Sequence, residues 1–295
     1  MEENSIKHRL TIFDAHCDTL SLMLDTDQKF KENTCNIDSS RQSEYKNYIQ
    51  TFACFIAPEY CSNSMERCLE MIDLFYEQNI NGILSIEGGN MITSMSSLRT
   101  LRRLGVRIAA LTWNYSNHIA SGVNETDLNR GLTEFGKKVI TEMNKIGMYV
   151  DVSHLNDKSF YDVAEISDAP IIATHSNSRS VCGHRRNLTD DMFKLIVSSG
   201  GCVGINFYPP FLEESGKADA DSIVKHIEHF MELGGENNIG IGADFDGTEN
   251  NLPIGIRGCQ DIYKVFERLL KLNYTDEQIE KISHKNFMRL FIPNV

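Results

Sequence analysis

Residues 10–18 of this chain read LTIFDAHCD, an apolar run that ends in side chains able to bind a metal ion. The run has the composition of a buried strand, which we expect over residues 10–15. No glycine-rich phosphate-binding turn follows it, although the first strand of a doubly wound nucleotide-binding sheet normally carries one. The opening therefore favours another parallel architecture.

Seven further short apolar runs follow, and amphipathic stretches fill most of the gaps between them. This alternation is typical of strands and helices around a parallel sheet. It predicts an α/β fold, a (β/α)8 TIM-type barrel, as a single domain over residues 1–295. The expected strands are residues 10–15, 51–57, 82–86, 107–112, 148–153, 170–174, 202–207 and 239–243. The expected helices include residues 64–78, 132–146, 190–198, 222–233, 262–272 and 276–290.

Local signals mark where several of these helices begin and end. Thr275 followed by Gln278 is a capping-box pattern, and Thr189 precedes two aspartates that suit a helix N-terminus. Glycines follow four helical stretches, where a left-handed C-cap is expected. These glycines are Gly82, Gly105, Gly147 and Gly200.

Composition excludes several classes of partner. The formal net charge is −12, from 29 basic and 41 acidic residues, so no basic face is expected for nucleic acid or an anionic membrane. Residues 1–7 are polar, and no apolar stretch approaches the ~20 residues of a membrane span. We expect a cytoplasmic protein that binds neither nucleic acid nor membrane.

Polar side chains recur where the expected strands end. The C-terminal ends of barrel strands build the active site, so metal-binding side chains at those positions carry weight. Strand geometry puts His16 and Asp18 on one face and directs Cys17 into packing. The candidates are His16, Asp18, Glu87, His154, His175 and Asp244.

This set suits two divalent ions. Three His, one Asp and one Glu are too many for a single four-coordinate zinc that keeps a position open. Glu87 is the expected bridge, and Gly88 and Gly89 let backbone pass close to the metals. The cofactors are expected to be two divalent ions, with Zn²⁺ favoured and manganese or cobalt as alternatives for the same positions. A hydroxide between the ions is the expected nucleophile, and Asp244 is the expected proton shuttle.

The ordered motifs resemble those of the membrane dipeptidase (renal dipeptidase) family of binuclear zinc metallopeptidases, over nearly the whole chain. They are residues 14–18 (DAHCD), 87–89 (EGG), 151–154 (DVSH), 174–176 (THS), 180–187 (SVCGHRRN) and 244–247 (DFDG). The resemblance implies one ion on His16, Asp18 and Glu87, and the other on Glu87, His154 and His175. It also implies that Arg186 binds the C-terminal carboxylate of a small dipeptide and that the chain forms a homodimer. We expect L-L dipeptides as substrates, and L-D dipeptides stay open as a second kind of substrate.

One segment departs from the family pattern. Where many relatives carry a substrate-binding His after Leu-Thr, residues 111–115 read LTWNY. Trp113 and Asn114 are therefore the expected substrate contacts, through the indole N–H or the amide.

Two other functions compete with a dipeptidase. One is another amidohydrolase-type barrel that acts on a cyclic amide, a lactam or a lactone. Those enzymes commonly begin His-x-His and often bridge their metals with a modified Lys, whereas this chain has Asp18 and Glu87 instead. The other is an inactive metal-binding scaffold, which would more readily have lost a ligand or the shuttle.

Two further histidines receive a structural interpretation. His226 and His229 stand three residues apart on an expected helix, and the charged Lys225 and Glu228 directly precede them. We expect them on a solvated helical face rather than at a metal.

Overall fold

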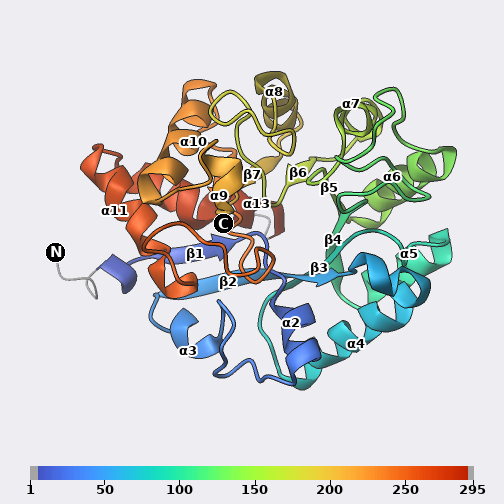
Figure 1. Ribbon diagram of the computed structural model, residues 1–295, viewed down its shortest axis with the longest axis horizontal. Coiled ribbons are helices and arrows are strands. Elements are labelled where there is room, and N and C mark those ends of the chain that lie inside the picture. The colour runs from blue at the N-terminus through green and yellow to red at the C-terminus, as the bar shows by residue number, and fades with distance from the viewer. Residues whose placement is uncertain (1–5, 292–295) are drawn as a thin grey trace.

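The eight expected strands form a closed parallel barrel, shown in Figure 1 with the helices around it. The computed structural model describes residues 6–291. Its strands are β1 (Thr11–Asp14), β2 (Asn47–Phe55), β3 (Ile83–Glu87), β4 (Val106–Ala110), β5 (Tyr149–Asp151), β6 (Ile172–Ala173), β7 (Cys202–Ile205) and β8 (Ile239–Ile241). All pairs of neighbours are parallel, so the carboxyl ends of all eight strands meet at one mouth.

The barrel closes where β1 pairs with β8, with Asp14 opposite Ile241. Closure leaves no free edge, and the buried strands read as apolar because both faces are covered. Most strands are shorter than expected, and β6 has only two residues. Strand pairing therefore ends before most of the polar side chains, which lie in the segments that continue over the mouth of the barrel.

Helices surround the strands in chain order (Figure 1). The main ones are α2 (Thr19–Thr26), α4 (Ser64–Glu77), α5 (Met95–Arg103), α6 (Glu134–Ile146), α7 (Asp157–Ile166), α8 (Asp190–Ser198), α10 (Ala220–Glu232) and α11 (Tyr263–Lys271). Shorter elements are α3 (Ser39–Gln42), η1 (Pro58–Asn63), α9 (Pro209–Leu212), η2 (Cys259–Asp261), α12 (Asp276–Glu280), η3 (Lys281–Lys285) and α13 (Asn286–Phe291). Their apolar faces pack against the strands to form the core.

The helix expected over residues 276–290 is interrupted. It consists of α12, a π-helical turn over Lys281–Lys285 and α13. Asn286 donates its amide to the carbonyls of Glu236 and Ile239 at 2.9 and 2.8 Å, and Phe287 stacks on Phe13 of β1. The wide turn places these side chains against the strands.

Most capping expectations are confirmed. Thr275 and Gln278 form a capping box, and the Thr189 side chain accepts from the Met192 N–H. Of the four glycines expected after helices, Gly105, Gly147 and Gly200 adopt positive φ.

The expectation for Gly82 is wrong. The left-handed residue after α4 is Asn79, with φ of 51°. Gly82 is needed for a different reason, because a Cβ there would lie 2.7 Å from the Gln50 carbonyl oxygen of the neighbouring strand.

His226 also contradicts its expectation. It is fully buried, its Nδ1 accepts from the Ser178 N–H at 3.0 Å, and its Nε2 lies 3.1 Å from the Leu212 carbonyl oxygen. The neutral ring thus ties the loop after β6 to α9. His229 is partly exposed and pairs with Asp190 at 2.8 Å.

The burial of His226 predicts an acid-sensitive fold. Burial lowers the pKa of His226 to about 4. Between pH 6.5 and 4 the unfolded chain would therefore hold a proton that the folded chain excludes, so the free energy of unfolding falls as the pH drops, by about 3 kcal/mol in total. Urea unfolding from pH 7 to pH 4 should show a smaller loss for His226→Gln than for the wild type. The exposed His8→Gln should keep the wild-type slope, and equal slopes in all three proteins would refute the assignment.

None of the helices within residues 6–291 is both long and apolar enough to cross a bilayer. The expectation drawn from the polar composition of residues 1–7 falls largely on residues 1–5, which lie outside the described residues.

Candidate metal centre

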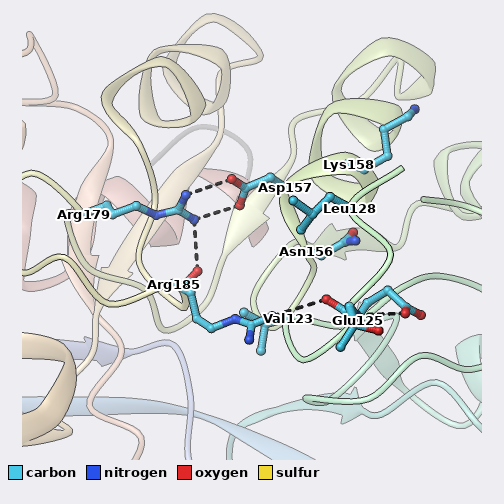
Figure 2. Close-up of a pocket in the computed structure, with 9 residues that line it drawn as sticks. Val123, Glu125, Leu128, Asn156, Asp157, Lys158, Arg179 and Arg185 are labelled. Atoms are coloured by element: carbon cyan, nitrogen blue, oxygen red, sulfur yellow. Dashed lines mark hydrogen bonds and ion pairs between the residues drawn. The ribbon is translucent and has the colours of Figure 1, made fainter. Parts of the chain in front are cut away.

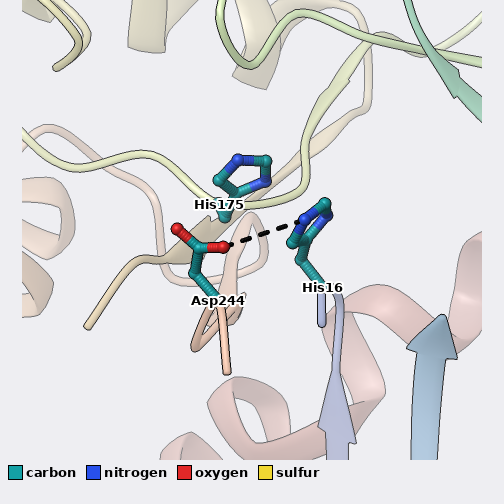
Figure 3. Close-up of side chains that lie close together, drawn as sticks. All are labelled: His16, His175 and Asp244. Atoms are coloured by element: carbon teal, nitrogen blue, oxygen red, sulfur yellow. Dashed lines mark ion pairs between the residues drawn. The ribbon is translucent and has the colours of Figure 1, made fainter. Parts of the chain in front are cut away.

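Six buried side chains gather at the barrel mouth, each at the end of a strand. They are His16 and Asp18 after β1, Glu87 at the end of β3, His154 after β5, His175 after β6 and Asp244 after β8. None is more than 9% exposed. Figure 3 shows His16, His175 and Asp244 facing one another. The structure thus brings together every residue that the sequence offered as a ligand or shuttle.

Glu87 occupies the middle of this group. Its Oε1 lies 2.8 Å from Nε2 of His154 and 3.5 Å from Nε2 of His175, whereas its Oε2 lies 3.5 Å from Nε2 of His16. The two oxygens therefore face different imidazoles. Asp18 and Asp244 lie 3.7 and 3.8 Å from the His16 Nε2.

The donor atoms fit divalent cations. Three overlapping groups each place their ligand atoms within 4.8 Å of one another. They are His16–Asp18–Glu87, Glu87–His154–His175 and His16–His175–Asp244. Three of these atoms are buried without a hydrogen-bond partner in the described chain: His16 Nε2, Asp18 Oδ1 and Glu87 Oε1. Buried polar atoms normally have partners, and a metal ion would supply them.

Neighbouring side chains fix which nitrogen each imidazole presents. His154 Nδ1 lies 2.9 Å from the Asn114 amide oxygen, which can only accept, so Nδ1 carries the proton. The Thr174 hydroxyl donates to Asp151 and lies 2.8 Å from His175 Nδ1, from which it must accept. Both rings therefore direct an Nε2 lone pair at Glu87, as ligating histidines do.

Removing the Thr174 hydroxyl should weaken metal binding. Thr174→Val keeps the shape but leaves His175 Nδ1 and Asp151 without their link, and partners of this kind contribute about 10–100-fold to metal affinity. Competition with a chromogenic chelator should show that loss for Thr174→Val and wild-type affinity for Thr174→Ser. Equal Zn²⁺ affinities for all three proteins would show that the hydroxyl does not orient the ring.

The ionisation of the group indicates crowded negative charge. Burial, with the nearby Asp18 and Glu87 carboxylates, raises the pKa of Asp244 to about 7. Burial and Glu87 raise the pKa of Asp18 to about 6. Although burial alone would lower the pKa of His16, Glu87 and Asp18 raise it well above its usual value. A cation among these groups would favour their carboxylates as anions.

Two of the six residues have a strained backbone. His154 and Asp244 have φ of 66° and 62°, and Asp246 beside them has 66°. Non-glycine residues rarely adopt this region, and such strain concentrates at functional sites. Here it turns each side chain toward the group at the point where its strand ends.

A cavity of about 320 Å³ opens onto the group and is lined by both residues that depart from the family pattern, Trp113 and Asn114. The Trp113 ring lies 5.4 Å from that of Phe55 and 6.3 Å from that of His154, centroid to centroid. Asn114 lines the cavity while its oxygen holds His154. Tyr208 and Phe211 line the same cavity.

Arg186 is a buried cation with no ion pair among the described residues. It is 5% exposed, and its guanidinium donates to the Ser176 hydroxyl at 2.9 Å and to the His175 carbonyl at 3.2 Å. Its Nε has no hydrogen-bond partner in the part of the chain that the structure describes. Burial lowers its pKa to about 10, which still leaves it charged at neutral pH. Phe211 lies 5.9 Å from the guanidinium and connects it to the cavity wall.

Sequence reasoning assigned no role to three residues that support the group. Asp151 and Thr174 lie inside quoted motifs, yet their link to His175 needs two different strands to be placed side by side. Asn206 donates to Asp244 Oδ2 at 2.9 Å and follows β7 directly. The signal that could have identified Asn206 was its position as a polar residue at a strand end. Asp246 accepts from the Thr19 hydroxyl and the Asn36 N–H, so it orders the last loop.

A separate cavity of about 560 Å³ lies beside the loops after β4, β5 and β6 (Figure 2). Arg179 forms a two-pronged ion pair with Asp157 at its edge, and both distances are 2.8 Å. None of the six clustered side chains lines it. The chemistry therefore belongs to the smaller cavity over the cluster.

A closed parallel barrel with imidazoles and carboxylates at its carboxyl mouth defines the class of metal-dependent barrel hydrolases. The chain belongs to the membrane dipeptidase family, peptidase family M19, whose model matches residues 61–293. It is thus a peptidase of a metal-dependent family, and the cluster supports the use of divalent metal.

The chain is similar in sequence and in structure to several known proteins. A Klebsiella pneumoniae protein described as uncharacterised, in the pqqA 5′ region, is 34% identical over 77% of this chain and 84% of its own length. A dipeptidase described as uncharacterised from Schizosaccharomyces pombe is 34% identical over 70% of this chain, which spans about half (51%) of that protein. A metallopeptidase from Rhodobacter sphaeroides, solved with a phosphinate mimic of L-Ala-D-Ala, superposes with a TM-score of 0.84 at 26% identity, covering 96% of this chain and 98% of that one.

Proposed function

We propose that this chain is a binuclear dipeptidase that hydrolyses L-L and L-D dipeptides with a free C-terminal carboxylate, and that its two ions are zinc. The observation that carries the proposal is Arg186, a buried guanidinium that has no carboxylate partner among residues 6–291 and is hydrogen-bonded to the His175 backbone. An unpaired buried cation is costly, and a bound carboxylate would compensate it with charge-assisted hydrogen bonds.

The five proposed ligands divide into two sets around Glu87. His16 and Asp18 would hold one ion together with Glu87 Oε2, and His154 and His175 would hold the other with Glu87 Oε1. When bound, two such ions activate water at neutral pH and polarise the scissile carbonyl. The ligand chemistry, imidazole with carboxylate, is that of zinc sites.

The other residues handle the substrate and the protons. Arg186 holds the terminal carboxylate, which selects dipeptides over internal peptide bonds. Asp244, oriented by the Asn206 amide at 2.9 Å, accepts a proton at Oδ1 and passes it to the leaving amine. Trp113 and Asn114 shape the cavity wall, and Asn114 also fixes the His154 tautomer.

The Rhodobacter protein supports this choice of substrate, because its ligand is a dipeptide mimic and its fold covers nearly all of this chain. We would test the proposal with Zn²⁺-loaded protein against L-L and L-D dipeptides, their C-terminal amides and their N-blocked forms. Turnover is expected only with a free carboxylate. Turnover of cyclic amides, lactams or lactones in place of dipeptides would favour the competing amidohydrolase reaction. Two bound metals with no turnover of any of these compounds would favour the scaffold.

A further inference from the structure

A second cavity, of about 430 Å³, adjoins the cavity over the metal centre. The two share Asp18, Trp113, Gly247 and Glu249 in their walls. The far side of the second cavity is formed by the chain after β2, which includes Glu59 of η1. A molecule bound at the metal centre can therefore extend into it.

The rim of the second cavity carries two free negative charges. Glu59 and Glu249 are exposed, and each forms no ion pair or hydrogen bond with the rest of the described chain. Two of the other acidic wall residues are engaged, since Asp25 pairs with Arg67 and Asp246 accepts from Thr19 and Asn36. No Lys or Arg lines this cavity among residues 6–291.

The wall between the rim and the candidate metal centre combines a carboxylate with an apolar surface. Asp18, one of the proposed metal ligands, lines the junction of the two cavities and is 6% exposed. Trp113 and Phe55, whose rings lie 5.4 Å apart, form an apolar wall beside it. An apolar wall that ends in carboxylates complements a side chain with an aliphatic stem and a cationic head.

The direction of a bound dipeptide decides which of its residues reaches this cavity. Arg186 is hydrogen-bonded to the backbone carbonyl of His175. The His175 ring faces Oε1 of Glu87, so Arg186 lies on the Oε1 side. The second cavity opens at Asp18, beside His16 on the Oε2 side. A dipeptide with its carboxylate at Arg186 and its scissile bond over Glu87 thus places its N-terminal residue toward the second cavity.

We propose that the second cavity is the subsite for the N-terminal side chain of the substrate and that it selects Lys or Arg there. The proposal rests on the proposed dipeptidase function for the direction of the substrate. The aliphatic stem lies along Trp113 and Phe55, and the cationic head lies between Glu59 and Glu249.

The test compares Lys-Ala with norleucine-Ala, which has a side chain of similar length and no charge. We would measure kcat/KM for both with the wild type, with the double variant Glu59→Gln/Glu249→Gln, and with Glu165→Gln as a matched control on the exposed surface of α7. The same two dipeptides would be titrated by calorimetry into Zn²⁺-loaded Asp244→Asn protein, with and without the double substitution, so that binding is measured without turnover.

The wild type should prefer Lys-Ala, and the double variant should lower that preference about ten-fold, because two partly exposed charge pairs are lost. The control should keep the wild-type ratio. Equal kcat/KM and equal affinity for the two dipeptides in the wild type, or an undiminished preference in the double variant, would overturn the subsite. Selective binding of Lys-Ala that depends on Glu59 and Glu249, without hydrolysis, would support the subsite and overturn the dipeptidase function instead.

Discussion

Asp244→Asn should lower kcat for dipeptides about a thousand-fold, because an amide keeps the shape of the carboxyl group but cannot take up or deliver the proton. The Asn206 amide, 2.9 Å from Asp244 Oδ2, can still donate to the new side-chain oxygen, so the local structure should persist. Pre-steady-state and steady-state kinetics with a fast dipeptide substrate would measure the loss.

Metal content provides the control for this variant. Asp244 lies with His16 and His175 in one of the three possible ligand groups, so a loss of activity could also arise from a lost ion. Elemental analysis should find the wild-type number of ions in Asp244→Asn. A variant that is inactive because it has lost metal would make Asp244 a ligand, and one with undiminished kcat would remove it from the reaction.

Arg186→Met should lower kcat/KM for free-carboxylate dipeptides about 100- to 1000-fold, because a buried charge pair with the substrate is lost. C-terminally amidated dipeptides, which offer no carboxylate, should be affected far less. Arg186→Lys should recover only part of the loss, since an ammonium cannot form the two parallel hydrogen bonds of a guanidinium.

The neighbouring Arg185→Met is the matched control. Arg185 sits in the same loop but is exposed and lines the separate cavity of Figure 2. It should retain wild-type kinetics with every dipeptide. If Arg185→Met instead showed the loss and Arg186→Met did not, the carboxylate site would lie on the outer side of the loop.

The meeting of the candidate ligands at the barrel mouth could be predicted from the sequence because a barrel gathers the ends of all its strands in one place. Once β1, β3, β5, β6 and β8 are parallel strands of one closed sheet, polar residues at their carboxyl ends must meet at one mouth. Glu87 and His154 are 67 positions apart in the sequence, yet Oε1 and Nε2 lie 2.8 Å apart. No periodicity within a single segment carries that information.

Residues whose partners belong to other elements could not be predicted. His226 looks like a surface residue between Lys225 and Glu228, and only the approach of the loop after β6 to α9 buries it. Gly82 follows a helix, but its constraint comes from the Gln50 carbonyl on the adjacent strand. In both cases tertiary packing overrides the local pattern.

Titration of metal-free protein with Zn²⁺, with dipeptide hydrolysis measured at each step, tests the central claim most directly. Glu87 presents Oε2 to His16 and Oε1 to His154 and His175, so activity toward free-carboxylate dipeptides should appear as the second equivalent of Zn²⁺ binds. Full activity at one equivalent, or two equivalents bound with no hydrolysis of any dipeptide, would contradict a binuclear dipeptidase.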